Sequence, residues 1–441
     1  MVFLVAVFAV FAGRDAWTTF PILLGACVLF LLADADILTR REDRLVDVPL
    51  ITGLCLLGLQ LIPLPGPVVQ ALSPHAEAAQ RAYAIAPLDV AWRPLTVHPG
   101  ATRTALSLAL SAALTFWAAR SAFARGGRRS ALFLLSGLAT CGAIMSVAQR
   151  ITAPRTLLWI RRLPDPRAMP FGPFVDRNQL ATWLLLVIML TLGLLVMEVR
   201  HEGGDDDGSW RRLLQALSRG GTPTVVVGLL LMLATLAATV SRSGAAGLVV
   251  AVAAFTALGR TSSRRRLQAV LGTMGLLLVL AVFVNAEGLA SRVSDTLGPT
   301  TAGRVEIWRS TLPIVFDFPF VGTGGGTFAD VMLLYQHAGW TVLFNHAHNE
   351  YLQLLAEGGV LLLGIVAVGV GGLVAVARAR LRHDHGGDRW MRVGACAALI
   401  GIAVQSLWET GLRSPANLLL AAMVAALAVA DPRARRHRST Q

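Results

Sequence analysis

The sequence predicts an all-α membrane protein of about 12 transmembrane helices, with a partly helical loop domain on one side. Three observations lead to this prediction. The 441 residues have a mean hydropathy of +0.62, and only 15% of them are charged. Apolar runs of roughly 17 to 22 residues recur along the chain, which is the length needed to cross the hydrocarbon core of a bilayer. The basic residues gather in short segments between these runs.

The apolar runs fall into two groups. About nine lie in an N-terminal transmembrane region, residues 1–285, and the others lie in a C-terminal region, residues 351–430. The first run is short, and the charged pair Arg14-Asp15 follows it closely. The expected bounds are 2–12, 18–33, 46–63, 103–121, 130–148, 179–198, 223–240, 244–259, 267–285, 351–377, 393–411 and 415–430.

The distribution of arginine predicts the orientation. All 39 basic residues are arginine, and 24 of them lie in six segments that alternation of the runs places on the same side. By the positive-inside rule this side is cytoplasmic, so both termini are expected inside, with 431–441 as a basic tail. The net charge of +13 is therefore attributed to topology and not to nucleic-acid binding. The six segments are 34–45, 120–130, 199–222, 260–266, 378–392 and 431–441.

Three long segments are then expected on the outer side, at about 64–102, 149–178 and 286–350. Long loops in compact proteins usually carry function. The last one contains a helix-like stretch, 303–316, which Pro319 ends, and a glycine-rich turn follows at 322–326.

Histidines cluster at the end of the longest outer segment, where His337, His346 and His348 fall within twelve residues. A neutral imidazole can accept a proton near neutral pH, so His348 is a candidate general base. The alternative is that His348 and Asn349 form a polar helix entry, with Asn349 as the N-cap. The residues alone do not decide between these two interpretations.

Two arginines on the outer side are candidates for anion binding. Arg242 stands between two apolar runs with almost no loop, at a depth where charged groups usually face a cavity or a partner. A snorkelling side chain is the alternative, but the outer side is where the positive-inside rule disfavours arginine. Arg304 opens the loop helix, and its planar donors suit diphosphate oxygens. Taken alone, a surface ion pair with Glu306 or another nearby acid explains Arg304 better.

The sequence contains no pattern typical of a metal site or a nucleotide-binding site. The outer acids are scattered and form no DxD pair or three-ligand group, so no metal site is expected. The turn at 322–326 lacks the lysine and the preceding strand of a nucleotide-binding loop, so no nucleotide cofactor is expected.

Five short tracts together resemble the O-antigen ligase and polymerase superfamily. They are SRSG from Ser241, GRVEIW from Gly303, GTGGGTF from Gly322, HNEYLQ from His348 and EGG from Glu357. The fragment 172–184 (GPFVDRNQLATWL) is similar to an Asn-bearing stretch of the same family. The resemblance implies a polytopic, metal-independent inner-membrane glycosyltransferase with a large periplasmic loop. Its donor would be a glycan on undecaprenyl diphosphate.

Carried over to this sequence, the resemblance implies that His348, Arg242 and Arg304 are the catalytic residues. Arg177, Asn178, Asn349 and His346 are candidate substrate-binding residues. Leu362 stands where the ligase pattern has Gly, Thr or Tyr, which leaves open the choice between a ligase and a polymerase.

The predicted function is transfer of a glycan from undecaprenyl diphosphate to an acceptor hydroxyl on the periplasmic side. The acceptor would be lipid A core, another glycan (O-antigen or exopolysaccharide), or the hydroxyl of a protein side chain, as in a protein O-oligosaccharyltransferase. Membrane lipids are the other expected partners. The competing class is a transporter or flippase, whose arginines would bind an anionic lipid-linked substrate without chemistry.

Overall fold

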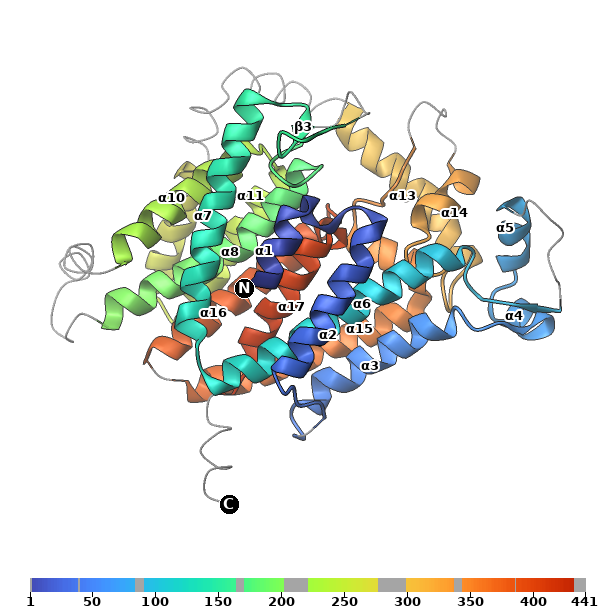
Figure 1. Ribbon diagram of the computed structural model, residues 1–441, viewed down its shortest axis with the longest axis horizontal. Helices are drawn as coiled ribbons and strands as arrows, with labels where there is room; N and C mark the ends of the chain where they lie inside the picture. Colours follow the sequence, from blue (N-terminus) through green and yellow to red (C-terminus); the bar gives the residue numbers. More distant parts are fainter. Residues whose placement is uncertain are drawn as a thin grey trace.

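The computed structural model describes residues 2–38, 40–83, 91–163, 170–201, 221–276, 299–336, 343–384 and 386–431. Helices form most of the regular structure in these residues, as Figure 1 shows, in line with the predicted all-α class. The described strands are two antiparallel pairs of two residues each. β1 (Leu64–Pro65) pairs with β2 (Trp92–Arg93), and β3 (Thr156–Leu157) pairs with β4 (Arg161–Arg162).

The N-terminal helices are shorter than the apolar runs predicted. α1 (Val2–Ala9) has eight residues, so it rises only about 12 Å and cannot cross a bilayer alone. Two 3-10 turns, η1 (Phe11–Gly13) and η2 (Ala16–Thr18), follow it. They lead into α2 (Thr19–Leu32) and then α3 (Arg44–Leu59).

Among the described residues, four helices are long and apolar enough to cross a membrane. They are α6 (Pro99–Arg125), α7 (Arg128–Thr152), α8 (Arg177–His201) and α15 (Glu350–His383). Shorter apolar helices include α10 (Thr222–Ala238), α11 (Arg242–Leu258) and α17 (Pro415–Val429). The fold is that of a multi-pass membrane protein. The predicted run 267–285 begins inside a helix that starts at 263, and its part from 277 onward lies outside the described residues.

α8 is the central helix of the bundle. It packs against α7, α10, α11, α17 and α16 (Gly386–Gln405). Gly193 of α8 lies so close to α16 that an added Cβ would be 2.6 Å from the carbonyl oxygen of Trp390. Small residues at such contacts let helix backbones approach closely in membranes. α15 differs, because most of its surface is exposed and apolar, as expected of a helix that faces lipid.

Described residues from four of the six segments expected on one side of the membrane lie together at one end of the bundle. Ion pairs connect Arg40 and Arg380 to Asp431, Arg380 to Glu42, and Arg128 to Asp388. These pairs join the α2–α3, α6–α7 and α15–α16 connections to the end of α17, at the lower edge of Figure 1. The β3–β4 pair and α13 (Pro299–Asp317) lie at the opposite, upper edge.

A separate hydrophobic cluster forms the core of the loop domain. Residues from two long outer segments build it together. One contributes α4 (Gly66–Leu72), α5 (Ala76–Tyr83) and the chain after β2, and the other contributes α13 and α14 (Phe328–Tyr335). Residues 286–350 were expected to form most of this cap. Residues of 64–102 also pack into the same core, because Val69 and Val97 are buried there beside Phe318 and Val331.

The glycine-rich turn packs against a break in α15. Gly359 has a left-handed φ of 64°, and an added Cβ there would lie 2.2 Å from the carbonyl oxygen of Phe320. The break frees backbone groups of α15, and these groups form hydrogen bonds to the turn segment. Thr323 N donates to Ala356 O (3.0 Å), and Val360 N donates to Pro319 O (2.8 Å). The turn at 322–326 therefore fixes the loop domain to α15, and its glycines are explained by packing.

Candidate active site

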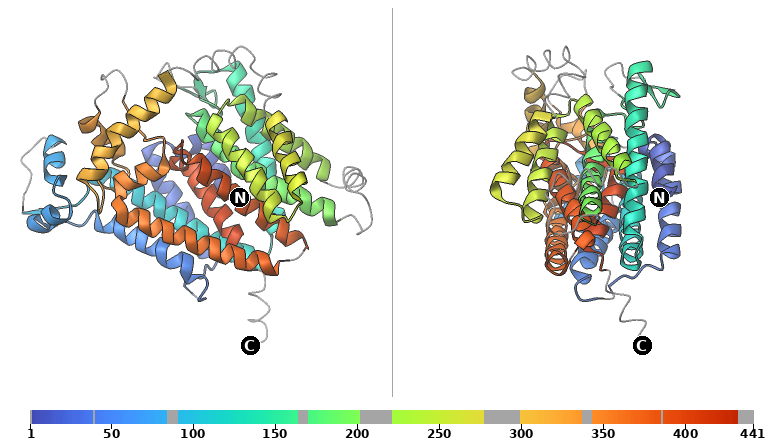
Figure 2. Two further views of the ribbon diagram at one scale, coloured as in Figure 1. Left: turned by 180° about the vertical axis from the view of Figure 1, so that it is seen from behind. Right: turned by 90° about the vertical axis from the view of Figure 1, so that its left-hand side faces the viewer.

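Three segments distant in sequence meet at the upper end of the bundle: α13, the start of α15, and the connection between α16 and α17. α16 ends at Gln405, although the apolar run predicted a helix to 411. The bonds Leu407 N to Val404 O and Trp408 N to Gln405 O close its last turn. Ser406 O accepts from Glu350 N (2.9 Å), which ties this connection to the first residue of α15. Figures 1 and 2 show the convergence in orange and red.

Glu409 lies at the centre of this convergence. Its side chain is only 3% exposed. Oε1 lies 3.1 Å from Nδ1 of His348 and also accepts from Thr410 N. Oε2 lies 3.5 Å from the guanidinium of Arg304. One buried carboxylate therefore connects two residues predicted to be catalytic, which are 44 positions apart in sequence.

Electrostatics keep Glu409 ionised. Burial acts to raise the pKa of the Glu409 carboxyl, but the hydrogen bond from His348 and the charges of His348 and Arg304 lower it further than burial raises it. Glu306 was the expected partner of Arg304 if that arginine formed a local surface pair. The ion pair with Glu409 instead directs Arg304 toward His348.

His348 and Asn349 fulfil both interpretations of the sequence at once. Asn349 is the N-cap of α15, and its side-chain oxygen accepts from Leu352 N (3.0 Å). The imidazole of His348 points instead to Glu409 and is one-third exposed. His348 has a left-handed φ of 48°, a conformation that non-glycine residues rarely adopt and that recurs at functional sites. The helix cap thus fixes the backbone from which His348 reaches Glu409.

His346 belongs to a neighbouring polar network. Its Nδ1 lies 3.4 Å from the side-chain amide of Gln353, which donates to Glu357. Arg413 of η3 (Gly411–Arg413) pairs with Glu350 (2.7 Å) and Glu357 (2.6 Å). Burial, followed by the positive charge of Arg413, lowers the pKa of His346 to about 4. His346 is therefore neutral at neutral pH. His337 lies outside the described residues.

Arg242 begins α11, and its side chain is exposed. Ser241 caps the helix by accepting from Gly244 N (3.2 Å), and Val240 before it has a left-handed φ of 49°. An added Cβ at Gly244 would lie 2.8 Å from Cβ of Ala181, so α11 begins beside the first turn of α8. The packing of α11 on α8 places Arg242 at this end of the bundle.

The first turn of α8 carries Arg177 and Asn178. Asp176 just before it accepts from Asn178 N (2.8 Å). Burial and then the negative charge of Glu409 raise the pKa of Asp176, while the charges of His348 and Arg177 act in the opposite direction. Asp176 is therefore within electrostatic range of both Glu409 and His348. Asn417 completes the connection by donating to Gln179 O and Gly411 O.

The arrangement gathers all of the predicted site residues toward one end, although their contacts differ. His348 and Arg304 share Glu409, Asn349 and His346 support the start of α15, and Arg177, Asn178 and Arg242 lie on the adjoining helix ends. Glu409 was not among the residues predicted from the sequence. A signal for it was present, because an acid inside an apparent membrane run is costly unless it has a partner or a function.

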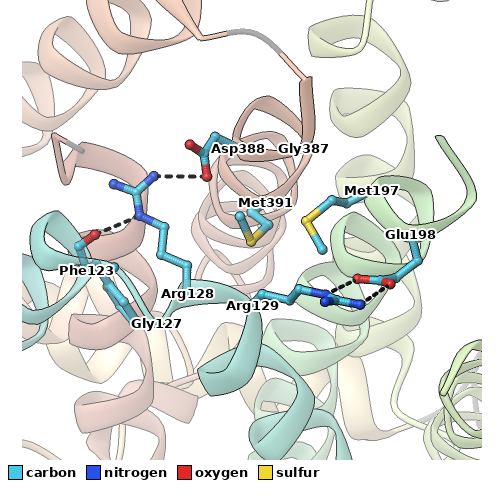
Figure 3. A pocket seen from close by; sticks show the side chains of 10 residues that line it. Phe123, Gly127, Arg128, Arg129, Met197, Glu198, Gly387, Asp388 and Met391 are labelled. Atoms are coloured by element: carbon cyan, nitrogen blue, oxygen red, sulfur yellow. Dashed lines mark hydrogen bonds and ion pairs between the residues drawn. The ribbon is translucent and has the colours of Figure 1, made fainter. Parts of the chain in front are cut away.

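A pocket of about 440 Å³ lies at the opposite end of the bundle. Figure 3 shows that its arginines are already paired: Arg129 binds Glu198 through two bonds of 2.7 Å, and Arg128 lies 3.4 Å from Asp388. Both arginines of this pocket already pair with a carboxylate, which disfavours a bound anion there. The described residues that line it include none of the predicted site residues.

Part of the sequence is similar to a known protein family. Residues 227–367 match the family model described as O-antigen ligase, a stretch that runs from α10 into α15. It contains Arg242, Arg304, His346 and His348, whereas Glu409 and the start of α8 lie outside it. No curated protein matches the sequence. The matched domain supports a ligase function of the membrane glycosyltransferase type. This part of the chain is therefore similar to the O-antigen ligase family.

Proposed function

We propose that the protein transfers a glycan from undecaprenyl diphosphate to an acceptor hydroxyl at the site around Glu409. The observation that carries this proposal is the buried Glu409 carboxylate, which holds an imidazole on one oxygen and faces a guanidinium with the other. A base oriented by a carboxylate, next to a cation that can bind phosphate, is what displacement of a diphosphate by an alcohol requires.

His348 acts as the base in this proposal. Ionised Glu409 favours the proton on Nδ1 of His348, which leaves Nε2 to accept the proton of the acceptor hydroxyl. The carboxylate also stabilises the imidazolium that results. The acceptor oxygen forms its bond to the anomeric carbon while the bond from that carbon to the phosphate oxygen breaks. A single displacement of this kind inverts the anomeric configuration.

Arg304 and Arg242 hold the donor. The leaving undecaprenyl diphosphate takes the electron pair of the broken bond, so negative charge on its oxygens grows in the transition state. Guanidinium groups placed near those oxygens stabilise that charge and need no metal ion for this purpose. In this proposal Arg177 and Asn178, at the start of α8, contact the diphosphate or the first sugar. His346 and Asn349 shape the site from the start of α15.

The topology predicted from the distribution of arginine indicates on which side of the membrane the reaction would take place. The segments rich in arginine would face the cytoplasm with both termini, so the site would open to the periplasm of a cell with an inner membrane. The acceptor would then be lipid A core, a growing O-antigen or exopolysaccharide chain, or a protein hydroxyl. The donor sugar follows from the host and not from the residues described above.

The experiment that tests the proposal follows the donor in cells and in proteoliposomes. Wild type, His348→Ala, Glu409→Gln and Arg304→Ala are compared after each is shown to be inserted in the membrane. Transfer predicts that the lipid-linked glycan accumulates unconsumed on the outer side in all three variants, and the product that they lack identifies the acceptor. Consumption at the wild-type rate by His348→Ala would rule out this chemistry. Loss of outward delivery in the Arg304 variant would instead indicate transport.

A further inference from the structure

A second cavity, of about 530 Å³, lies in the loop domain between the β2 segment and α14. This volume is in the range of pockets that bind small organic ligands. Its walls come from the outer segments 64–102 and 286–350. Arg93 and His98 line it from the first segment, and Asp330 lines it from the second. The residues described above for the active site do not line it.

Arg93 is a buried cation with unused donors. Its side chain is 7% exposed, and its Nη2 donates to Glu77 (2.6 Å). In the part of the chain that the structure describes, no acceptor hydrogen-bonds its Nε or Nη1. Buried donors are costly to leave unpaired, so they indicate a position that another group occupies. The pairing of β2 with β1 holds the backbone of Arg93 in place, since Arg93 lies opposite Leu64.

Gln80 supplies an acceptor to the same cavity. Its side-chain nitrogen donates to Pro94 O (2.9 Å) and Thr96 O (3.0 Å). Its side-chain oxygen is buried, and no donor among the described residues reaches it. Two side chains that line the cavity therefore carry unpaired polar atoms, both donors and an acceptor, which are buried just behind its wall.

Aromatic and ionisable side chains complete the walls. Trp92 is 60% exposed and Tyr83 is 39% exposed, so both aromatic rings are accessible from the cavity side of the loop domain. His98 Nδ1 lies 2.7 Å from Asp330, and the Tyr83 hydroxyl donates to the backbone oxygen of Asp330. Flat apolar rings beside polar groups fit a sugar, whose ring has apolar C–H faces and a rim of hydroxyls.

We propose that this cavity binds a sugar residue of the glycan, away from the site of transfer. This inference rests on the proposed function, since it assigns the cavity to the donor or acceptor glycan of that reaction. The hydrophobic cluster that includes Val97 beside the cavity also includes Ile307 of α13 and Ala347 next to His348. One hydrophobic core thus supports both the cavity and the active site. A glycan bound at Trp92 and Arg93 would therefore have a fixed orientation with respect to His348.

The test measures oligosaccharide binding to the full-length protein in detergent by titration calorimetry. Two probes are used: the oligosaccharide released by mild acid from the lipid-linked pool of the host, and the core oligosaccharide of its deacylated lipopolysaccharide. Trp92→Ala and Arg93→Lys are compared with Trp159→Ala, which removes an exposed tryptophan from the β3–β4 hairpin. We expect the first two variants to raise the dissociation constant of one probe on the order of tenfold, and the control to leave it unchanged.

The probe affected distinguishes a donor site from an acceptor site. Wild-type protein that binds neither oligosaccharide would overturn the inference, as would an unchanged dissociation constant in Trp92→Ala, whose exposed side chain is not needed for folding. His348→Ala separates the two proposals. It should lose transfer and keep wild-type binding. If His348→Ala transfers normally while Trp92→Ala binds weakly, the sugar site stands and the proposed chemistry fails.

Discussion

Asp47 and Glu409 are buried carboxylates at opposite ends of the bundle, and their hydrogen-bonding potential is satisfied very differently. Asp47 in α3 is fully buried and accepts four hydrogen bonds, two from Arg120, one from Trp117 and one from Leu38 N, all at 2.8 to 2.9 Å. Glu409 is nearly as buried, yet among the described residues its Oε2 has no hydrogen-bond donor and faces Arg304 at 3.5 Å.

The difference is the one that the proposed function predicts between a structural carboxylate, Asp47, and a functional one, Glu409. The Asp47 network is saturated, so it has no capacity for a ligand and holds α3 to α6. The Glu409 network includes partly exposed His348 and Arg304, and His348 has a left-handed backbone. Incomplete satisfaction together with backbone strain is stable only where the surroundings enforce it, and such places are often functional.

The largest expected effect is that of His348→Ala on transfer. Removing a general base should lower kcat by about 100-fold to 10,000-fold, with little change in the apparent melting temperature. Transfer is measured with purified protein and lipid-linked donor. His75→Ala is the matched control, because His75 is an exposed histidine of the loop domain outside the site. A similar loss in the control, or none in His348→Ala, would contradict the assignment.

Asp47→Ala should lower the stability of the protein and leave its catalytic activity unchanged. It leaves the buried guanidinium of Arg120 without its carboxylate, which costs about 3–5 kcal/mol of stability. The yield of folded protein and the apparent melting temperature should fall, while the transfer rate per folded molecule is retained. A specific activity reduced as far as in His348→Ala would show that the two networks are not separate in function.

Arg304→Lys should have an intermediate effect. Lysine keeps the charge but loses the planar set of donors, so we expect kcat/KM to fall about tenfold and Arg304→Ala to fall further. Arg309→Lys is the control, since Arg309 lies on the same helix and is exposed. Equal rates for Arg304→Lys and wild type would mean that charge alone suffices at this position.

The sequence predicted the long helices because their apolar runs match the thickness of a bilayer, and α6, α7, α8 and α15 are present. It also selected His348 and Arg304, whose types suit the chemistry. It did not predict Glu409, because the apolar run 393–411 conceals the end of α16 at Gln405. That end depends on a contact from Glu350 N to Ser406 O, which joins residues 56 positions apart.

The loop domain shows the same limit of sequence reasoning. The helix at 303–316 was predicted from its own residues and is present in α13. Its packing partners in α4 and α5 come from a loop more than 200 residues earlier, and local patterns do not reveal such a pairing. The sequence pattern therefore did not predict a role for Arg93 or Gln80. Their unpaired atoms can be identified only in the folded domain.

The smallest expected effect concerns His346 and pH. Its folded-state pKa of about 4 lies below the ordinary value of 6.5, so the folded protein keeps His346 neutral where the unfolded chain would bind a proton. The stability associated with this shift is present above about pH 6.5 and is lost as pH falls toward 4. The apparent melting temperature should fall less between pH 7 and 5 in His346→Gln than in wild type. Identical slopes would contradict this.

The central claim is that Glu409 and His348 act as one catalytic unit, and a double-mutant cycle tests it most directly. Transfer rates are measured for wild type, Glu409→Gln, His348→Ala and the double variant, each checked for folding. A unit predicts that Glu409→Gln alone lowers kcat on the order of 100-fold or more and that the double variant is no slower than His348→Ala. Effects that multiply in the double variant, or a Glu409→Gln protein as fast as wild type, would contradict the claim.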